Sequence, residues 1–335
     1  MQTRDKLLEL LESNRGTYFS GETIARALSL SRSAVWKAVK ALQNDGYAIT
    51  AVTNKGYCLS DDTDILSVQG IRKYLHPRLA GLDITVLTTA SSTNSVLREQ
   101  AAGGIPEGRV ILANEQSAGR GRSGRTFFSP AETGIYMSLL LRPGNCTAVQ
   151  ALQLTTMAAV AVCEAIDAVS GFQEKAQIKW VNDIYLHRKK VCGILTEGSF
   201  SLENGMLEYA VLGLGINLYP PKQSFPAELE SLAGAVLQAP KSDAKNRLTA
   251  EFLNRFYDHY AGSEALPSYI EEYRKRCFVI GKQVQLLSGG KPKAAVVLDI
   301  DDQCRLLVKY ENGTEEICSS GEISVYAPEV KGWEV

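Results

Sequence analysis

The chain has 335 residues, of which 45% are hydrophobic and 22% are charged, values typical of folded globular proteins. A chain of this length predicts two or three domains. No apolar run approaches about 18 residues and the charged N-terminus lacks a signal-peptide core, so we expect no membrane span and a cytoplasmic location. Seven cysteines without a C-x-x-C pair and three scattered histidines indicate neither a zinc site nor a histidine-based triad.

The net charge of −1 is unevenly distributed, because residues 1–60 carry eight Lys and Arg against five Asp and Glu. Leu7, Leu8 and Leu11 repeat with the spacing of a helix face. Two further short helices follow, and Ser31 is the expected N-cap of the third. Two short strands around the turn at 54–56 then predict a hairpin. Three helices, a hairpin and a basic surplus together predict a winged helix-turn-helix.

The third predicted helix carries an aromatic and basic stripe beside its apolar face. Such a helix suits a DNA major groove and its flanking phosphates, and a lysine at the hairpin tip could reach a neighbouring phosphate. The alternative is a three-helix packing module with solvated lysines. The predicted DNA-binding residues are Arg32, Ser33, Trp36, Lys37, Lys40 and Lys55. The acidic, polar stretch at 60–67 is a predicted linker.

From residue 69 to about 265, strands and helices alternate, which predicts an α+β domain with a mixed sheet. The long apolar helix expected at 148–171 should pack on that sheet. A pair of helices is expected within 246–276. The segment from residue 282 onward reads as four or five short strands, which predicts a small SH3-like β-barrel.

The segment EQSAGRGRSGRTFFSP (115–130) interleaves three glycines with three arginines. It matches G-x-G-x-x-G, but a strand rather than a helix is expected after it, which argues against a dinucleotide-binding loop. A linker would not contain Phe-Phe-Ser-Pro, and an RNA-binding tail would repeat its Arg-Gly units. Glycines let backbone N–H groups approach an anion, and arginines bind phosphate or carboxylate. We therefore interpret this segment as a folded clamp for a small anionic ligand.

Two further segments carry candidate ligand contacts. In IKWVND (178–183), strand alternation would separate Lys179 from Trp180, and Asp183 would start a turn. The lysine could direct a positive charge at a phosphoryl group, or it could be a snorkelling lysine at a strand edge. In LGLGIN, two glycines two apart within 213–217 would leave one face of a strand open to a ligand.

The segments SSTN (91–94), GRGRSGR (119–125), KWVND (179–183) and GLGIN (213–217) occur in this order behind the predicted winged helix. Together they make the chain similar to the bifunctional biotin–protein ligase and biotin-operon repressor family, over essentially its whole length. The resemblance implies three domains: a winged helix-turn-helix at 1–62, a catalytic domain at 68–276 and an SH3-like domain at 277–328.

The resemblance implies that biotin and Mg-ATP give biotinyl-5′-adenylate, and that the biotinyl group then passes to a lysine of a biotin carboxyl carrier protein. It also implies repression of biotin genes at operator DNA by a ligand-promoted homodimer. The lack of a Walker A motif agrees with adenylation. A biotin-sensing repressor without catalytic activity and a lipoate-type ligase are the alternatives.

The resemblance also assigns roles to single residues. The expected catalytic residues are Lys179, Arg120 and Arg122. The expected biotin-binding residues are Ser92, Thr93, Asn94, Gln116, Gly119, Arg120, Lys179, Gly193 and Gly215. The expected adenylate-binding residues are Arg122, Phe127, Asn182, Asp183 and Asn217, and the metal ligands are unknown. The chain departs from the family at Val181, where proline is common, and at Phe127, where tryptophan is frequent.

Overall fold

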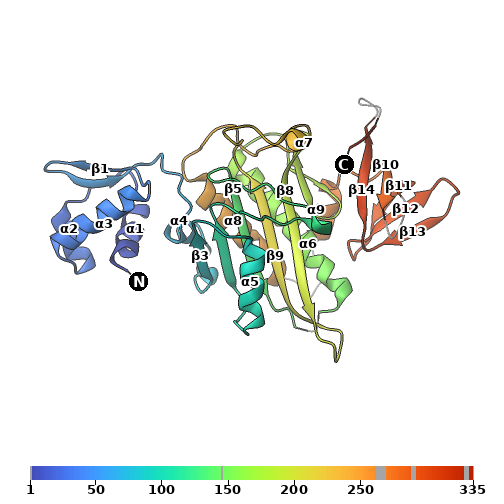
Figure 1. The fold of residues 1–335 in the computed structure, drawn as a ribbon, viewed down its shortest axis with the longest axis horizontal. Coiled ribbons are helices and arrows are strands. Elements are labelled where there is room, and N and C mark those ends of the chain that lie inside the picture. Colours follow the sequence, from blue (N-terminus) through green and yellow to red (C-terminus); the bar gives the residue numbers. More distant parts are fainter. Residues whose placement is uncertain (1, 145, 262–268, 288–291, 328–331, 335) are drawn as a thin grey trace. The chain divides into compact units, whose positions relative to one another are not determined.

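The computed structural model describes residues 2–144, 146–261, 269–287, 292–327 and 332–334. The chain forms two compact units (Figure 1). The first unit comprises Met1–Ala80 and Ala239–Glu251, and the second comprises Gly81–Gln238 and Phe252–Val335. The first unit therefore contains more of the chain than the predicted DNA-binding head.

The first unit begins with three short helices and a two-stranded hairpin. Their bounds are α1 Thr3–Glu12, α2 Gly21–Leu28, α3 Arg32–Asn44, β1 Ile49–Val52 and β2 Gly56–Leu59. The backbone N–H of Ala34 donates to the Ser31 hydroxyl over 3.1 Å, so the predicted N-cap is confirmed. Leu7, Leu8 and Leu11 are buried in the core of these helices, as the spacing predicted. The winged helix-turn-helix is therefore present.

The segment at 60–67 is not a free linker, and in this respect the prediction was wrong. Thr63 and Ser67 are buried, although the acidic residues before them are exposed. The backbone N–H of Ser67 donates to Asn246 Oδ1 over 2.9 Å, and Asn246 Nδ2 donates to the Ile65 carbonyl over 2.8 Å. The composition of this segment gave no sign of these contacts, because their partner, Asn246, lies about 180 residues later in the chain.

The second unit is built on a seven-stranded sheet in the order β3-β4-β5-β9-β8-β7-β6. The strands are β3 Asp83–Leu87, β4 Arg109–Ala113, β5 Gly134–Leu141, β6 Gln177–Lys179, β7 Asp183–Leu186, β8 Lys189–Phe200 and β9 Leu207–Asn217. Strands β3 and β4 are parallel, and the remaining neighbours are antiparallel. The predicted mixed sheet is confirmed.

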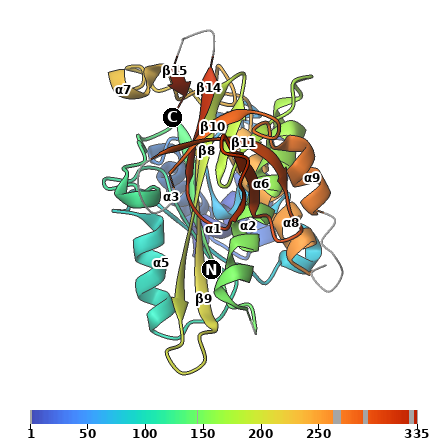
Figure 2. The same ribbon diagram turned by 90° about the vertical axis from the view of Figure 1, so that its right-hand side faces the viewer.

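Helices cover both faces of this sheet. Figure 2 shows α5 (Thr93–Ala102) on one face and α6 (Ala148–Ser170) with α9 (Tyr269–Arg276) on the other. The window 151–170 of α6 is long and apolar enough to cross a membrane, but 72% of it is buried inside the protein. It is therefore a core helix, as predicted. Helix α8 (Ala244–Ala261) is the first of the expected helical pair, and residues 262–268 before α9 lie outside the described residues.

The C-terminal segment forms an antiparallel sheet in the order β13-β12-β11-β10-β14-β15, so its described part has six strands rather than the expected four or five. Their bounds are β10 Gln283–Leu287, β11 Lys293–Ile300, β12 Leu306–Tyr310, β13 Glu315–Cys318, β14 Glu322–Ala327 and β15 Gly332–Glu334. The indole Nε1 of Trp180 donates to the Cys304 carbonyl over 3.0 Å. This buried bond ties the C-terminal segment to the loop between β6 and β7.

That loop corrects one sequence-based expectation. Asp183 does not start a turn, because it is the first residue of β7 and pairs with Lys179 across the β6–β7 hairpin. Trp180 and Val181 are both 3% exposed, so strand alternation ends at Lys179. The turn itself consists of the three residues between Lys179 and Asp183.

Candidate active site

A pocket of about 540 Å³ opens in the second unit, where the segment 115–130, here called the glycine–arginine loop, meets strands β6–β9 and the C-terminal sheet. This volume suits a small organic ligand. Nearly all the predicted ligand contacts line it: Ser92, Thr93, Asn94, Gln116, Arg120, Arg122, Phe127, Lys179, Asn182, Asp183, Gly193, Gly215 and Asn217. Gly119 is not among the lining residues, and within the loop it lies against Phe127 and Ser129.

The glycine–arginine loop is a folded hairpin that joins β4 to β5. Gly121 N–H donates to the Arg125 carbonyl over 2.7 Å, and Phe127 N–H donates to the Gly119 carbonyl over 2.9 Å. A Cβ at position 119 would lie 2.4 Å from the Phe127 carbonyl oxygen, so the hairpin needs glycine there. The Tyr136 hydroxyl donates to the Pro130 carbonyl over 2.9 Å and secures the far end of the loop.

A group of hydrogen-bonded polar side chains forms part of the pocket wall. Gln116 Oε1 accepts from the Thr93 backbone N–H over 2.8 Å, and its Nε2 donates to the Ser129 hydroxyl over 3.0 Å. The Ser138 hydroxyl lies 2.8 Å from Thr93 Oγ1 and 2.6 Å from Asn94 Oδ1. These side chains hold one another in fixed positions, so the pocket presents preorganised donors and acceptors.

Lys179 is only 6% exposed although it lines the pocket. It ends β6, and its ammonium lies 6.0 Å from the centre of the Tyr185 ring on β7. A buried cation beside an aromatic face interacts strongly with any anion that enters, because little water screens it. This position favours the ligand-directed interpretation of Lys179 over that of a snorkelling surface lysine.

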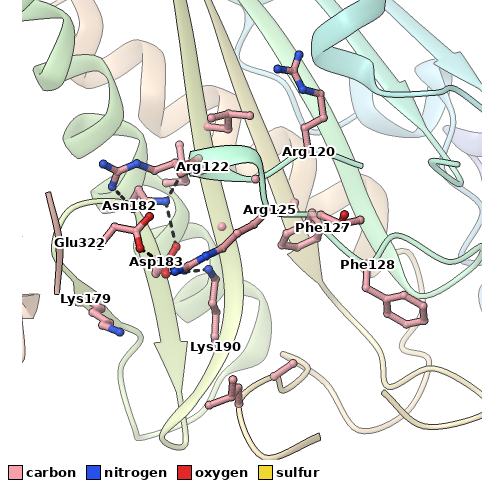
Figure 3. Close-up of a pocket in the computed structure, with 18 of the residues that line it drawn as sticks. Arg120, Arg122, Arg125, Phe127, Phe128, Lys179, Asn182, Asp183, Lys190 and Glu322 are labelled. Carbon is pink, nitrogen blue, oxygen red and sulfur yellow. Dashed lines mark hydrogen bonds and ion pairs between the residues drawn. The ribbon is translucent and has the colours of Figure 1, made fainter. Parts of the chain in front are cut away.

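Arg122 and Asn182 meet near Lys179 (Figure 3). Arg122 Nη1 donates to Asn182 Oδ1 over 2.8 Å, and Asn182 Nδ2 donates to Asp183 Oδ1 over 3.0 Å. Asp183 in turn pairs with Lys190 on β8 over 2.8 Å. The sequence placed Arg122 and Asn182 60 residues apart, and the fold brings them into direct contact.

Arg120 has a different environment. Its guanidinium pairs with Glu197 over 3.1 Å, and its side chain is 42% exposed. Figure 3 shows it pointing away from the side of the pocket that holds Lys179 and Arg122. Arg120 and Lys179 are therefore not brought together in this structure, and Arg120 would have to leave Glu197 to face the same ligand atoms.

The Phe127 ring lies directly on the two glycines predicted to line the pocket floor. A Cβ at Gly215 would lie 2.4 Å from this ring, and one at Gly193 would lie 3.3 Å from it. Gly213 is covered by Asn94 instead, whose Oδ1 would lie 2.1 Å from a Cβ there. Protein side chains therefore cover these glycines in this structure, and Phe127 supplies the apolar surface over the pocket floor.

Sequence reasoning missed the contribution of the C-terminal sheet. Arg125 Nη2 donates to Glu322 Oε2 over 2.7 Å, and the Ser123 hydroxyl donates to Glu322 Oε1 over 2.7 Å. Arg122 Nη2 also donates to the Gly321 carbonyl over 3.3 Å. The only sign of this contact in the sequence was Arg125, a charged residue of the motif to which no ligand role was assigned. Glu322 gave no sign of it, since acidic residues are common in surface strands.

The pocket wall also contains an apolar segment that carried no sequence signal. Phe225, Leu229, Leu232 and Ala233 line the pocket. The Phe225 ring meets Phe128 of the glycine–arginine loop edge-on at a centroid distance of 6.4 Å. The wall therefore combines apolar cover with the cationic and polar groups described above, as is usual in sites for small organic ligands.

The predicted DNA-binding residues lie together on the first unit. Arg32, Ser33, Trp36, Lys37 and Lys40 are all exposed on α3, and Lys55 is exposed between β1 and β2. Trp36 is 53% exposed, which is unusual for tryptophan without a partner surface. The ammonium of Lys55 lies 5.8 Å from the centre of the Tyr18 ring. Both α3 and the tip of the hairpin therefore expose basic side chains.

Comparisons with known proteins assign each part of the chain separately. Residues 86–217 match the biotin/lipoate A/B protein ligase family, residues 3–58 match a helix-turn-helix domain, and residues 279–326 match the biotin protein ligase C-terminal domain.

Complete relatives extend the similarity over most of the chain. The bifunctional ligase/repressor BirA of Bacillus spizizenii is 34% identical, over 95% of this chain and 97% of its own length. The protein of the same name from Escherichia coli is 29% identical over 97% of each chain. The fold resembles that of the Aquifex aeolicus biotin protein ligase in complex with biotin and ATP, with a TM-score of 0.61 at 24% identity, covering 73% of this chain and 98% of that one.

Proposed function

The chain belongs to the family of bifunctional biotin protein ligases and repressors, and from this premise we propose how its residues divide the work. The family resemblance expected from the sequence motifs is confirmed. The chain is a ligase with an N-terminal helix-turn-helix domain. We assign DNA binding to residues 1–62, catalysis to 68–276 and a supporting SH3-like domain to 277–328.

In the first step, biotin is activated by ATP. A biotin carboxylate oxygen attacks the α-phosphorus, the bond to the β-phosphate oxygen breaks, and pyrophosphate leaves. Two anions must meet, so their repulsion has to be offset by nearby cations. Lys179 is the cation proposed to bridge the biotin carboxylate and the α-phosphate, because it is buried beside the pocket. Arg122 would contact the phosphate from the loop.

The biotin head would bind at the polar part of the pocket wall. The biotin ureido group needs both donors and acceptors, and Thr93, Asn94 and Gln116 provide them there. Ser92, Gly193 and Gly215 would complete this subsite, with Gly119 shaping the loop above it. The adenylate would lie toward Phe127, Asn182, Asp183 and Asn217, which line the pocket. Arg120 would join after exchanging Glu197 for the ligand.

Magnesium is proposed to arrive bound to ATP. The described residues contain no group of three or more His, Cys, Asp or Glu that could hold a metal ion. Protein-bound Mg²⁺ often uses only one or two carboxylates together with substrate phosphates and water. Asp183 is a carboxylate in the pocket wall suited to this role, and Lys190 now pairs with it. When bound, the ion would neutralise charge on the phosphates.

In the second step, the amine of an acceptor lysine attacks the acyl carbon of biotinyl-adenylate, and AMP leaves. The acceptor is proposed to be a biotin carboxyl carrier protein. The protein is also proposed to act in the cytoplasm as a biotin-responsive repressor that binds operator DNA through α3 and Lys55. One winged helix offers a modest interface, so a ligand-promoted homodimer would place two heads on spaced half-sites.

The observation that carries this proposal is the convergence of Lys179, Arg122 and Asn182 on one pocket whose wall also includes hydrogen-bonded polar side chains. The test is to incubate the purified chain with biotin, Mg-ATP and a carrier domain, and to measure biotinyl-adenylate, pyrophosphate and labelled carrier. We expect all three products. Labelling with lipoate in preference to biotin would indicate a lipoate-type ligase, and binding of biotin without any pyrophosphate would indicate a sensor without catalytic activity.

The repressor function has a separate test in the salt dependence of DNA binding. Removing one phosphate contact should reduce the slope of log affinity against log salt by about one. We expect this reduction for Lys37→Gln or Lys40→Gln, with affinities measured on DNA selected by the wild-type chain. An unchanged slope in both variants would remove α3 from the DNA interface.

A further inference from the structure

A compact group of four charged side chains lies within the first unit, and none of the four lines the pocket. Glu12, Arg15, Lys73 and Asp243, here called the anchor network, have side chains that are 1%, 8%, 20% and 6% exposed. Charged side chains are rarely so buried unless they are paired. Glu12 is the last residue of α1 and Arg15 lies in the turn after it, whereas Lys73 follows α4 (Val68–Arg72) and Asp243 precedes α8.

Each charge in the anchor network contacts at least one partner of opposite sign. Arg15 lies 2.8 Å from Glu12 and 2.8 Å from Asp243. Lys73 lies 3.1 Å from Glu12 and 2.5 Å from Asp243. Two positive and two negative charges therefore balance within one cluster, and each cation bridges both carboxylates.

Asp243 is the point where most of these contacts meet. Besides Arg15 and Lys73, its carboxylate accepts from the Tyr74 hydroxyl over 2.6 Å and from Asn246 Nδ2 over 2.8 Å. Its backbone has φ of +55°, a conformation that non-glycine residues adopt rarely and that Asp tolerates better than most. The left-handed backbone and the four side-chain partners fix this carboxylate in one position at the start of α8.

Contacts next to the anchor network also hold the DNA-binding helices against α4 and the start of α8. Arg15 Nη1 donates to the Thr63 carbonyl over 2.6 Å, so the segment after the hairpin is also bound. Gly70 of α4 lies against Asn246, whose Nδ2 would come within 2.4 Å of a Cβ there. Residues 244–251 of α8 belong to the first unit. The first unit thus joins the DNA-binding helices to α4 and to the first turns of α8.

Buried ion pairs contribute little net stability compared with apolar packing, but they can select one arrangement because any other leaves a charge unpaired. We propose that the anchor network holds the DNA-binding helices in one orientation on α4 and the start of α8, and that two heads bind one operator only in this orientation. Asp243 is the positioning residue. This inference rests on the proposed repressor function, since it presupposes that the helices bind DNA in pairs.

The test compares Asp243→Asn with Asp45→Asn in the full-length chain. Asp45 is the matched control, because it pairs with Arg4 inside the DNA-binding head and both side chains are more than 40% exposed. The first probe is a duplex that the wild-type chain selects from a random-sequence pool with biotin and ATP present; we expect it to carry two half-sites and call it the two-half-site duplex. The second probe is a shortened duplex with one half-site. Affinity for both probes and the rate of biotinyl-adenylate synthesis are measured.

We expect Asp243→Asn to bind the two-half-site duplex about tenfold more weakly, within the range of coupling between sites. Affinity for the single half-site and adenylate synthesis should stay within about twofold of wild type, the usual error of independent effects. The control should be unchanged on every measure. A merely structural defect in the head would weaken both duplexes equally.

Equal weakening on both duplexes, or wild-type binding of the two-half-site duplex, would overturn the proposal. If Asp243→Asn does not fold, Lys73→Met serves instead, because Lys73 is the most exposed member, and about fivefold selective weakening is expected. A wild-type chain that selects no duplex would instead remove the DNA-binding function itself. A selected duplex with a single half-site would contradict pairing of the heads, and with it this inference.

Discussion

The glycine–arginine loop and the anchor network both pair arginines with carboxylates, yet their surroundings differ sharply. In the loop, the side chains of Arg120 and Arg125 are 42% and 62% exposed, and their partners Glu197 and Glu322 are also partly exposed. In the anchor network, Arg15 and Asp243 are 8% and 6% exposed. Water can replace a partner in the first region but scarcely in the second.

This difference shows how one chain can use the same residue types for two purposes: to exchange one anionic partner for another, and to hold a structure in place. An exposed ion pair is worth little, so a loop arginine can exchange a protein carboxylate for a ligand anion at small cost. A buried charge that loses its partner stays desolvated, so the anchor network resists rearrangement. Burial, more than residue type, therefore separates the ligand-directed arginines from the positioning ones.

Lys179 is the most direct way to break this comparison, because it lies in the ligand region yet is as buried as the anchor network. Lys179→Ala should slow biotinyl-adenylate synthesis by roughly 10²–10³, the range for losing one preorganised group that stabilises a transition state. Pyrophosphate release in single-turnover reactions measures the effect. Lys222→Ala is the control, since Lys222 is 86% exposed and pairs with Glu132 outside the pocket. A rate near wild type for Lys179→Ala would reject the role.

Arg122 should give the next largest effect. Arg122→Met should still form biotinyl-adenylate but release it roughly 10- to 100-fold faster, the range for losing hydrogen bonds to a charged group. Dissociation of labelled adenylate measures the release rate. Arg109→Met is the matched control, because Arg109 pairs with Asp83 at 2.6 Å and does not line the pocket. Equal release from both variants would contradict the proposed contact between Arg122 and the adenylate.

The same contrast explains which features the sequence could predict. Local patterns carried the winged helix, because helix caps and the leucine spacing act within a few residues. The ordered motifs predicted the candidate pocket, since the start of α5, the glycine–arginine loop, the β6–β7 hairpin and β9 bring their segments together. Sequence reasoning missed Glu322 and the burial of Thr63 and Ser67, because the contacts of Glu322 and Ser67 are with partners far along the chain. It also misplaced Asp183, because strand alternation cannot reveal a tight hairpin after Lys179.

The pair formed by Arg125 and Glu322 provides the smallest but sharpest test. The side chains are 62% and 26% exposed, so the pair should be worth no more than a typical surface ion pair. Arg125→Glu alone places two carboxylates together and should weaken adenylate retention about two- to fivefold. Adding Glu322→Arg restores opposite charges in a solvated setting, so retention should recover to near wild type.

The matched exchange in the anchor network combines Arg15→Asp with Asp243→Arg. It should not recover two-half-site binding, because Lys73, Tyr74 and Asn246 fix the geometry around the buried carboxylate. Restoration in the loop without restoration in the anchor network is the expected result. If the loop exchange does not restore adenylate retention, the specific geometry of the Arg125–Glu322 pair matters and not only its opposite charges. The claim that the loop arginines can exchange partners at small cost would then be wrong.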